Sequence, residues 1–501
     1  MYVFQTSRFT ASTLADGNLG VVGYYRSSGT DTLAELKALS DLIKSNIDRI
    51  EAASKSTSLD FPSPWTPFTP PSEAGCMVPD VVDAITQIVA AASQLIAAVR
   101  PPPLTIISMG YSFYIPAALR TVIEVHVSEF LREAGNQGAH VKDIAKPTNI
   151  DSAKLTRILR LLASYHVFVE VAPDVFANNR LSSFLDSGKS VATLVAHPEK
   201  TYDATSGITA ALGHFGDKSF KAAVYLPDTL FDPAMAHSND ANKTAANKAF
   251  NMDLDWWSWY ETPGNEYRGT RFTHAMNGTR AFLLPKAIME GFDWEDLKEG
   301  AVVVDVGGGV GSQCLMLAED FSHLNFIVQD RAPVITEGEK FWQINKPEFV
   351  KAGKIKFQSY DFIHEKQPVK NADVFIIRAI LHDWADEYCV TILRSLRKVA
   401  TPTTRLLVID NVISYACEEE AVQDIPGVQK PHPPAPLLPN WGQAGAVAYL
   451  ADMQMLTCLN GQERTVTHLR NLLAKTGWKL VEVRRGTETA FSLKNVIAVP
   501  A

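Results

Sequence analysis

The sequence predicts an α/β protein in which a helical N-terminal part precedes a mostly parallel β-sheet wrapped by helices. Three observations support this: strand-length apolar runs alternate with helical stretches after Glu299, a glycine-rich loop follows the first of these runs, and a helix-turn-helix pattern with a hairpin lies upstream. A chain of 501 residues is too long for one ordinary core. We therefore expect an extension over 1–80, a helical domain over 81–297 and a sheet domain over 298–501.

Composition limits the possible partners and compartments. The formal net charge is -8, whereas proteins that bind nucleic acid usually present a basic face, so we expect no nucleic-acid partner. Five cysteines lie far apart without a CxxC pair, which argues against a disulfide framework or a zinc site. Because the N-terminus also has no apolar run like that of a signal peptide, we expect a cytoplasmic protein.

The first 100 residues contain two helical patterns separated by a connector. Residues 1–30 look irregular, leucines and isoleucines at helical spacing follow, and a proline-rich stretch begins at Phe61. The most apolar run, Ile88 to Val99, is shorter than the ~20 residues that a spanning helix needs. It is predicted to be a buried or partner-facing helix, with no membrane contact.

The segment around residues 141–182 has a winged-helix pattern. A short helix, a turn and a second helix capped by Asp151 or Ser152 are followed by VFVEV, a turn at Pro173-Asp174, and VFANN. Lys154, Arg157 and Arg160 would allow DNA binding, but no wider basic patch accompanies them. We favour a domain used for dimer contacts.

Further along, WWSWY (256–260) is interpreted either as core packing or as the wall of an aromatic-substrate pocket.

After Glu299 the pattern predicts a Rossmann-like sheet. The expected strands are AVVVDV, NFIVQD, KIKFQS, DVFIIRAIL and RLLVIDNVI, and the tail adds two strands joined by a turn at Gly486. Five parallel strands closed by a hairpin form the methyltransferase variant of the nucleotide-binding sheet. Ordinary dinucleotide folds instead repeat the first half.

The loop VDVGGGVGSQC indicates a ligand that lies on the backbone. Gly307, Gly309 and Gly311 follow the first strand, but Ser312 stands where a dinucleotide fingerprint has its third glycine. Asp330 ends the second strand and can accept hydrogen bonds from ribose hydroxyls. Asp361 and Phe362 follow the third strand and offer a carboxylate and an aromatic face for adenine. Together these strand ends predict an adenosine site.

The fourth strand delivers His382 to the same edge of the sheet. A metal site is not expected, because no second His or Cys lies at ligand spacing. A histidine that acts as a base needs an orienting acid, and Asp410, at the end of the fifth strand, and Glu463, in NGQERT, are the candidates. Asp386 is expected to cap the following helix.

These motifs resemble the S-adenosylmethionine-dependent, metal-independent O-methyltransferases of plants and fungi, the caffeic acid type. The resemblance rests on VVVDVGGGVG, VQD, YDF, RAILHDWAD and NGQERT, and with the winged helix it covers roughly residues 85–501. It implies a methyltransferase sheet preceded by a winged-helix dimerisation domain, S-adenosylmethionine as cofactor and a homodimer. It also implies that His382 is the general base bracketed by Asp410 and Glu463, and that Arg378 and Trp384 join Gly307, Asp330, Asp361 and Phe362 around the cofactor.

The sequence departs from the family pattern at three places. Asp410 stands where many members have glutamate, so its reach to His382 is shorter, and Arg378 stands where many have lysine. A proline-rich insert over 414–448 follows the fifth strand, where a loop could cover the pocket, and it resembles inserts of fungal members.

We expect an O-methyltransferase that acts on a hydroxyl of an aromatic, phenolic or polyketide-like small molecule. An alternative is a repurposed member that catalyses a pericyclic or dehydration step. The intact His382 and Glu463 favour methyl transfer. A winged-helix DNA-binding or cofactor-sensing protein has the least support.

Overall fold

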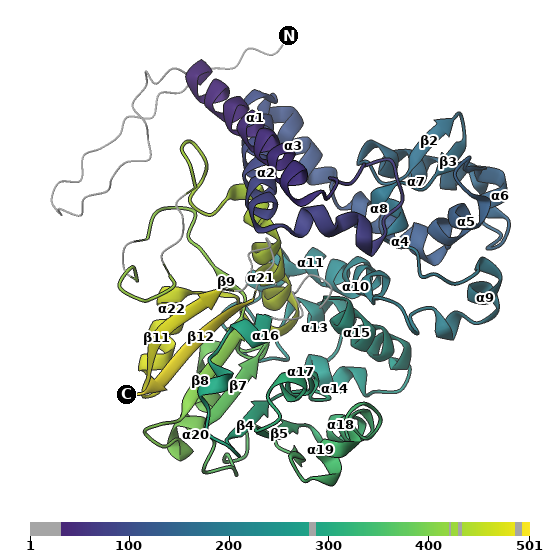
Figure 1. Cartoon of the computed structure of the whole chain (residues 1–501). Coiled ribbons are helices and arrows are strands. Elements are labelled where there is room, and N and C mark those ends of the chain that lie inside the picture. Colours follow the sequence, from purple (N-terminus) through teal and green to yellow (C-terminus); the bar gives the residue numbers. More distant parts are fainter. Residues whose placement is uncertain (1–31, 280–286, 420–421, 429–432, 486–492) are drawn as a thin grey trace.

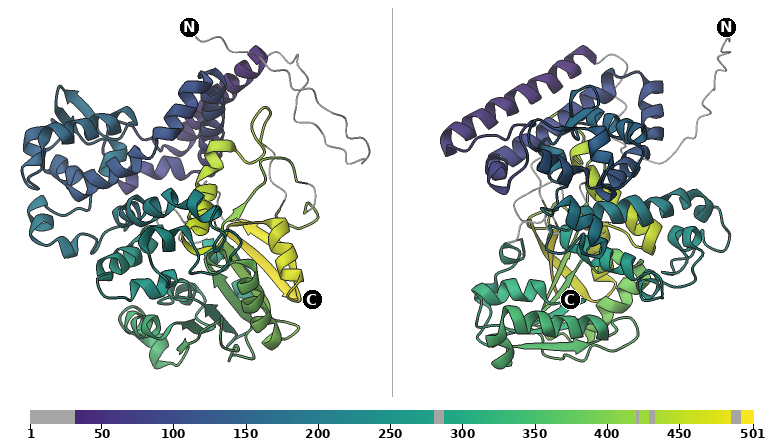
Figure 2. Two further views of the ribbon diagram at one scale, coloured as in Figure 1. Left: turned by 180° about the vertical axis from the view of Figure 1, so that it is seen from behind. Right: turned by 90° about the vertical axis from the view of Figure 1, so that its right-hand side faces the viewer.

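The structure, a computed structural model, describes residues 32–279, 287–419, 422–428, 433–485 and 493–501. Figures 1 and 2 show a helical N-terminal part at one end of the molecule and a sheet flanked by helices at the other, with helix α21 (Ala446–Leu459) between them. The predictions of irregular structure over residues 1–30 and of a turn at Gly486 both lie outside the described residues.

A seven-stranded sheet in the order β11-β12-β8-β7-β4-β5-β6 confirms the predicted fold class. Neighbouring strands from β8 to β6 are parallel, whereas β12 is antiparallel to β8 and β11 is antiparallel to β12. The strands are β4 (Val302–Val306), β5 (Asn325–Asp330), β6 (Ile355–Ser359), β7 (Val374–Arg378), β8 (Arg405–Asp410), β11 (Trp478–Arg485) and β12 (Lys494–Pro500). Because β4 lies between β5 and β7, the strand order reverses there, and ligands of open α/β sheets bind outside the carboxyl ends at such a point.

Both faces of the sheet are covered, which explains why its central strands β4, β7 and β8 are continuous apolar runs rather than alternating ones. On one face Val304 packs with α20 (Asp386–Val399) and α22 (Val466–Ala474). On the other face Val303 packs with α16 (Ala287–Glu290), α17 (Ser312–Asp320), α18 (Ala332–Asn345) and α19 (Pro347–Lys351). The two cores hold the strand ends in place and so fix the site that lies beyond them.

The winged-helix unit is also present. Helix α7 (Ser152–Ser164) is capped by Asp151, whose carboxylate accepts from Lys154 N at 2.8 Å, and it packs on α4 (Tyr114–Glu124) and α6 (Val141–Ala145). The wing is the sheet β1-β3-β2, made of Ala139–His140, Val175–Ala177 and Val169–Ala172. Arg160 binds Glu170 and Asp174 of this wing. One of the three basic residues is therefore occupied by acids, and the absence of a nucleic-acid partner stays a prediction.

The remaining helices form the N-terminal extension and the layer between the wing and the sheet (Figure 1). The extension contains α1 (Thr32–Thr57), α2 (Pro79–Val99) and α3 (Pro102–Tyr111). The others are α5 (Val127–Ala134), α8 (Arg180–Ser183), α9 (Val191–Ala196), α10 (Ile208–His214), α11 (Phe220–Val224), α12 (Leu226–Leu230), α13 (Ala245–Phe250), α14 (Trp256–Tyr260) and α15 (Glu266–Thr279).

The described part of the insert packs on the N-terminal extension. Leu437 and Ala444 share a small core with Leu39 of α1 and Ala90 and Ala91 of α2. Gln94 Nε2 donates to Pro436 O at 2.9 Å, and the 3-10 helix η7 (Gly442–Gly445) contacts α2. The extension and the insert, far apart in the sequence, thus form one substructure next to α21.

Two apolar helical stretches are more exposed than the sequence suggested. Pro79–Val99 and Pro102–Glu124 are long and apolar enough to cross a membrane by length and composition, yet only 22% and 11% of them are buried inside the chain. The first is longer than the predicted Ile88–Val99, and the second is two helices, α3 and α4, that meet at Ser112 and Phe113. Of the two predicted roles for the first stretch, exposure favours the partner-facing one.

Candidate active site

The glycine loop after β4 leaves room for a ligand. Gly309 has a φ of +60°, and a Cβ built on it would meet no atom within 4 Å. Gly307 has a φ of +72°, and its Cβ would collide with Ile380 on the loop after β7. The positive φ disfavours a side chain at both positions, and Gly307 also lacks the space for one. The open space above Gly309 is the room that a ligand can use. The loop is a cradle between β4 and β7.

Asp330 closes the cradle from the second strand. Its Oδ2 accepts from Gly309 N and its Oδ1 from Arg331 N, both at 2.8 Å. Burial raises the pKa of Asp330, while the two backbone donors oppose the rise. Each carboxylate oxygen has a second lone pair, so both can still accept a hydrogen bond from a hydroxyl. These free lone pairs suit the hydroxyls of a ribose, and the contact of Asp330 with the cofactor stays a prediction.

The aromatic pair Phe362 and Trp384 lies beside the loop. Their rings meet edge to face with centroids 6.0 Å apart, and Phe362 is also next to Gly307. Asp361 instead accepts from Ile363 N at 2.9 Å and contacts His364 Nδ1 at 2.8 Å, so its carboxylate stabilises the turn after β6. Its predicted contact with the cofactor stays a prediction. Arg378 ends β7, opposite Ile409 of β8, and its cofactor role also stays a prediction.

His382 lies in the 3-10 helix η6 (Leu381–Asp383), directly after β7. Its Nδ1 is 2.9 Å from Glu463 Oε1, and its Nε2 is 3.5 Å from Asp383 Oδ1. The Glu463 side chain is fully buried, while that of His382 is 17% exposed. Asn411 Nδ2 donates to the same Glu463 oxygen at 3.1 Å. Glu463 therefore fixes the imidazole through Nδ1, and Nε2 is the nitrogen that remains for a reaction.

The acids around His382 dominate its protonation. Burial alone would lower its pKa, but the negative charges of Glu463 and Asp383, the hydrogen bond that Nδ1 donates to Glu463 and the charge of Asp410 raise it to about 10. Burial raises the pKa of Asp383 to about 6, against the effect of His382. The imidazole is thus a strong base, and in the free protein it holds a proton at neutral pH.

Asp410 acts on His382 through charge rather than contact. Its side chain is buried, and its Oδ1 has no hydrogen-bond partner among the described residues. Burial raises the pKa of Asp410 to about 7, while the positive charge of His382 opposes the rise. Of the two acids predicted to bracket the histidine, Glu463 makes the hydrogen bond, and the shorter Asp410 does not.

Arg464 secures the loop that carries His382, and sequence reasoning missed it. Its Nη1 donates to Leu381 O at 2.6 Å, its Nη2 to Trp384 O at 2.7 Å, and it pairs with Asp386 at 3.0 Å. The prediction that Asp386 caps the following helix is wrong, because Ala385 occupies the cap position and Asp386 is the first helical residue. Its carboxylate binds Arg464 and His468 instead. The adjacency of Arg464 to Glu463 was the only signal available.

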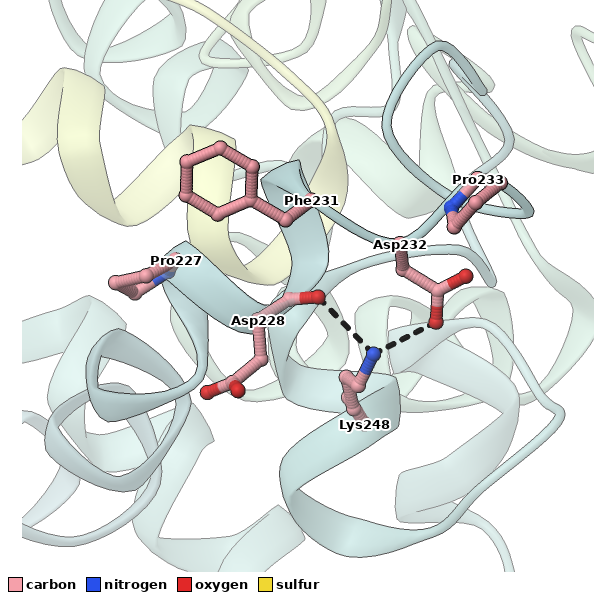
Figure 3. Close-up of a pocket in the computed structure, with 6 residues that line it drawn as sticks. All are labelled: Pro227, Asp228, Phe231, Asp232, Pro233 and Lys248. Atoms are coloured by element: carbon pink, nitrogen blue, oxygen red, sulfur yellow. Dashed lines mark hydrogen bonds and ion pairs between the residues drawn. The ribbon is translucent and has the colours of Figure 1, made fainter.

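A separate surface hollow has no comparable chemistry (Figure 3). In it Lys248 Nζ binds Asp232 Oδ2 at 2.6 Å and Asp228 O at 3.1 Å, so its cation is already paired. It is lined by Pro227, Asp228, Phe231, Asp232, Pro233 and Lys248. Within the described ranges, no group of three His, Cys, Asp or Glu side chains is arranged to hold a metal ion. The absence of a metal stays a prediction.

Sheet topology, glycine cradle and strand-end histidine together define a methyltransferase that uses S-adenosylmethionine. Residues 232–427 match the O-methyltransferase domain and residues 108–187 match the O-methyltransferase dimerisation domain. The chain is 40% identical over 451 residues to an O-methyltransferase of Armillaria gallica, covering 90% of this chain and 95% of that one. It is 37% identical to 4-O-methyltransferase 1 of Phanerochaete chrysosporium, covering 93% and 99%. The chain belongs to the O-methyltransferase family.

Solved structures share the fold at lower identity. A pericyclic reaction enzyme superposes with a TM-score of 0.62 at 20% identity, covering 83% of this chain and 94% of that one. Mitomycin 7-O-methyltransferase superposes with a TM-score of 0.59 at 21% identity, covering 82% and 99%. The family and fold predictions are confirmed, as is S-adenosylmethionine as the cofactor of the family to which the chain belongs. Two solved structures of this fold contain S-adenosylmethionine or S-adenosylhomocysteine.

Proposed function

We propose that this protein methylates a hydroxyl of an aromatic or polyketide-like small molecule, with His382 as the general base. The observation that carries the proposal is the Glu463–His382 pair at the carboxyl edge of the sheet, next to the glycine cradle. A base at that edge lies where ligands of open α/β sheets bind. Gly307, Gly309, Asp330, Asp361, Phe362, Arg378 and Trp384 are the proposed cofactor residues.

His382 would remove the proton from the acceptor hydroxyl through Nε2. Glu463 holds the ring through Nδ1 and stabilises the imidazolium that forms, and the charge of Asp410 adds to this. A phenol has a pKa near 10, so a histidine near 6.5 would be a poor base, whereas one raised to about 10 matches the acceptor. S-adenosylmethionine supplies an electrophilic methyl group on a positively charged sulfonium.

The same high pKa means that His382 must lose a proton before it can accept one. A further positive charge beside His382 would lower the pKa of the imidazole, because like charges disfavour the protonated form, and His382 would then release that proton more readily. We therefore expect methyl transfer to become faster as pH rises from neutral toward alkaline values.

We propose a homodimer built through the exposed apolar helices. The dimerisation domain supports it, and the second copy would cover α2, α3 and α4, where Ile106 and Met109 are 67% and 62% exposed.

The proposed division of the chain is an N-terminal extension over 1–80, a helical dimerisation domain over 81–297 and a cofactor-binding sheet domain over 298–501. We also propose a cytoplasmic location, which the five free thiols support, since disulfides are rare in reducing compartments.

A repurposed enzyme is the second candidate. The likeness to a pericyclic reaction enzyme favours it only at the level of the fold. The buried Glu463–His382 hydrogen bond favours methyl transfer, because a base that abstracts a hydroxyl proton needs this orienting acid.

One experiment separates the two candidates. The purified protein is incubated with S-adenosylmethionine carrying a labelled methyl group and a panel of phenols, alongside His382→Ala and the control His197→Ala, which changes an exposed histidine. We expect labelled product from wild type and His197→Ala and at least a 100-fold slower reaction with His382→Ala. Equal rates with His382→Ala would refute its role as base. Cofactor binding without labelled product would favour the second candidate.

A further inference from the structure

A buried lysine lies in the aromatic cluster, and no side chain in the described residues forms a hydrogen bond or an ion pair with it. Lys218 is 0% exposed, and its Nζ has no hydrogen-bond partner among the described residues. It lies against the face of Trp256, and 4.6 Å and 4.2 Å from the ring centroids of Trp259 and Tyr260. It belongs to a π-helical turn, η3 (Phe215–Ser219), between α10 and α11. Such turns are rare and occur frequently at functional sites.

Other hydrogen-bond donors near Lys218 also lack acceptors. Arg271 gives one nitrogen to Asp217, but its Nε and Nη1 have no partner in the described part of the chain. The same holds for His214 Nε2, one turn before Lys218, and for Tyr260 Oη. A buried donor without an acceptor costs about 1–3 kcal/mol. Several such donors in one place therefore indicate a missing acceptor.

Helix α21 connects this cluster to His382. Near its end, Cys458 packs in the aromatic cluster and lies within electrostatic range of Lys218. Four residues later Gln462 N donates to His382 O at 2.9 Å, and Glu463 holds the imidazole. Even in an extended chain, the α-carbons of Cys458 and Gln462 are at most about 14 Å apart. The loop of His382 and the aromatic cluster are therefore neighbours, separated by no more than the length of an aromatic molecule of ordinary size.

We propose that Lys218 is a binding residue for the acceptor, and that it selects aromatic hydroxyl compounds that also carry an anionic oxygen, such as a carboxylate. The proposal rests on the proposed function, which places the acceptor hydroxyl at His382. The rings of Trp256, Trp259 and Tyr260 contact the apolar part of the acceptor. The anionic oxygen accepts hydrogen bonds from Lys218 Nζ, which has no partner among the described residues. Under this proposal Trp256 and Trp259, which the free chain buries in a hydrophobic cluster, form the wall of the acceptor pocket.

The charge of Lys218 depends on what it binds. In the free protein burial lowers its pKa to about 5, so at neutral pH it is an uncharged amine. An anion beside it favours the ammonium form, so an anionic acceptor binds together with one proton from solvent. The titratable groups that face Lys218 in the described part of the chain are Cys458 on α21, Tyr260 on α14, Arg268 and Arg271 on α15, His214 on α10 and Asp217 on η3.

The test measures binding of matched acid and ester pairs, such as 4-hydroxybenzoate and methyl 4-hydroxybenzoate, to protein saturated with S-adenosylhomocysteine. The variants are Lys218→Met, which keeps the length without the amine, and Lys218→Arg, which restores a cation. The control is Lys221→Met, since Lys221 also lies on an aromatic ring, Phe250 at 4.3 Å, but is exposed. Thermal unfolding of each variant confirms that it is folded.

We expect wild type and Lys221→Met to bind the acid at least 10-fold more tightly than the ester, Lys218→Met to lose this preference, and Lys218→Arg to regain part of it. Calorimetry at pH 7.5 in two buffers of different ionisation enthalpy should show uptake of about one proton with the acid and none with the ester. Equal affinity of wild type for acid and ester, or an unchanged preference in Lys218→Met, would overturn the proposal. Failure of methyl transfer to both compounds, with the acid preference intact, would count against the proposed function alone.

Discussion

Replacing Glu463 by glutamine tests whether charge makes His382 a strong base. The amide oxygen can still accept the hydrogen bond from Nδ1 at 2.9 Å, so the ring keeps its orientation and only the negative charge is lost. The net difference between a pKa of about 10 and the ordinary 6.5 corresponds to about 5 kcal/mol, which Glu463, Asp383 and Asp410 produce together against the opposing effect of burial. If Glu463 contributes between a third and a half of it, the substitution lowers the pKa of His382 by about 1 to 2 units.

The assay is kcat/KM against pH from 6 to 10.5 with a phenolic acceptor, because this ratio reports ionisations of the free enzyme. We expect the wild-type rate to rise throughout, and the midpoint for Glu463→Gln to lie about 1 to 2 pH units lower. The plateau above that midpoint should be about 10-fold lower, since the imidazolium is less stabilised. The control Glu387→Gln removes an exposed acid from the same loop and helix and should leave the profile unchanged. A midpoint that stays at the wild-type pH in Glu463→Gln would refute the assignment.

Three further outcomes follow from the structure. Asp410→Asn should raise the melting temperature by several degrees at pH 8 but not at pH 4, as measured by scanning calorimetry. The reason is that an acid whose folded pKa is raised to about 7 loses its contribution to stability as pH rises from about 4 through 7. An unchanged melting temperature at pH 8 would contradict this. Asp330→Asn should weaken S-adenosylhomocysteine binding about 10- to 100-fold in titration calorimetry, because the carboxylate that accepts from Gly309 N and from ribose hydroxyls is lost; unchanged affinity would remove Asp330 from the site. Ile107→Glu places a charge on the exposed apolar helix α3 and should convert a dimer to a monomer in light scattering, whereas a dimer that persists would place the interface elsewhere.

The sheet could be predicted because its information is local. The central strands β4, β7 and β8 are buried apolar runs, and the seven strands lie where the sequence places them. The ends of β4, β5 and β7 then carry Gly307, Asp330 and His382 to one edge, which follows from parallel strands alone. Prediction failed where a long-range contact decided the outcome. Asp386 has the sequence context of a helix cap, but Arg464 and His468, about eighty positions later, take its carboxylate.

The basicity of His382 could not be predicted for the same reason. Sequence identifies the acids, but the pKa depends on which of them contact the ring and how deeply they are buried. Glu463 makes the hydrogen bond, Asp383 lies beside Nε2, and Asp410 acts only through its charge. The exposure of α2 and α3 could likewise not be predicted from the sequence, because an apolar helix has the same pattern whether its own chain or a partner covers it.

The segment NGQERT works as one unit because successive residues contact the loop of His382. A Cβ on Gly461 would collide with His382 O, so the chain can pass there only without a side chain. Gln462 N donates to that same oxygen, and Glu463 holds the imidazole. Arg464 donates to the carbonyls of Leu381 and Trp384, the residues before and after the dipeptide that contains His382. A substitution that breaks one of these contacts is expected to shift the base relative to the cradle. Since a displacement of about 1 Å can cost 100-fold in rate, Arg464→Lys should reduce kcat strongly even though it never touches the acceptor.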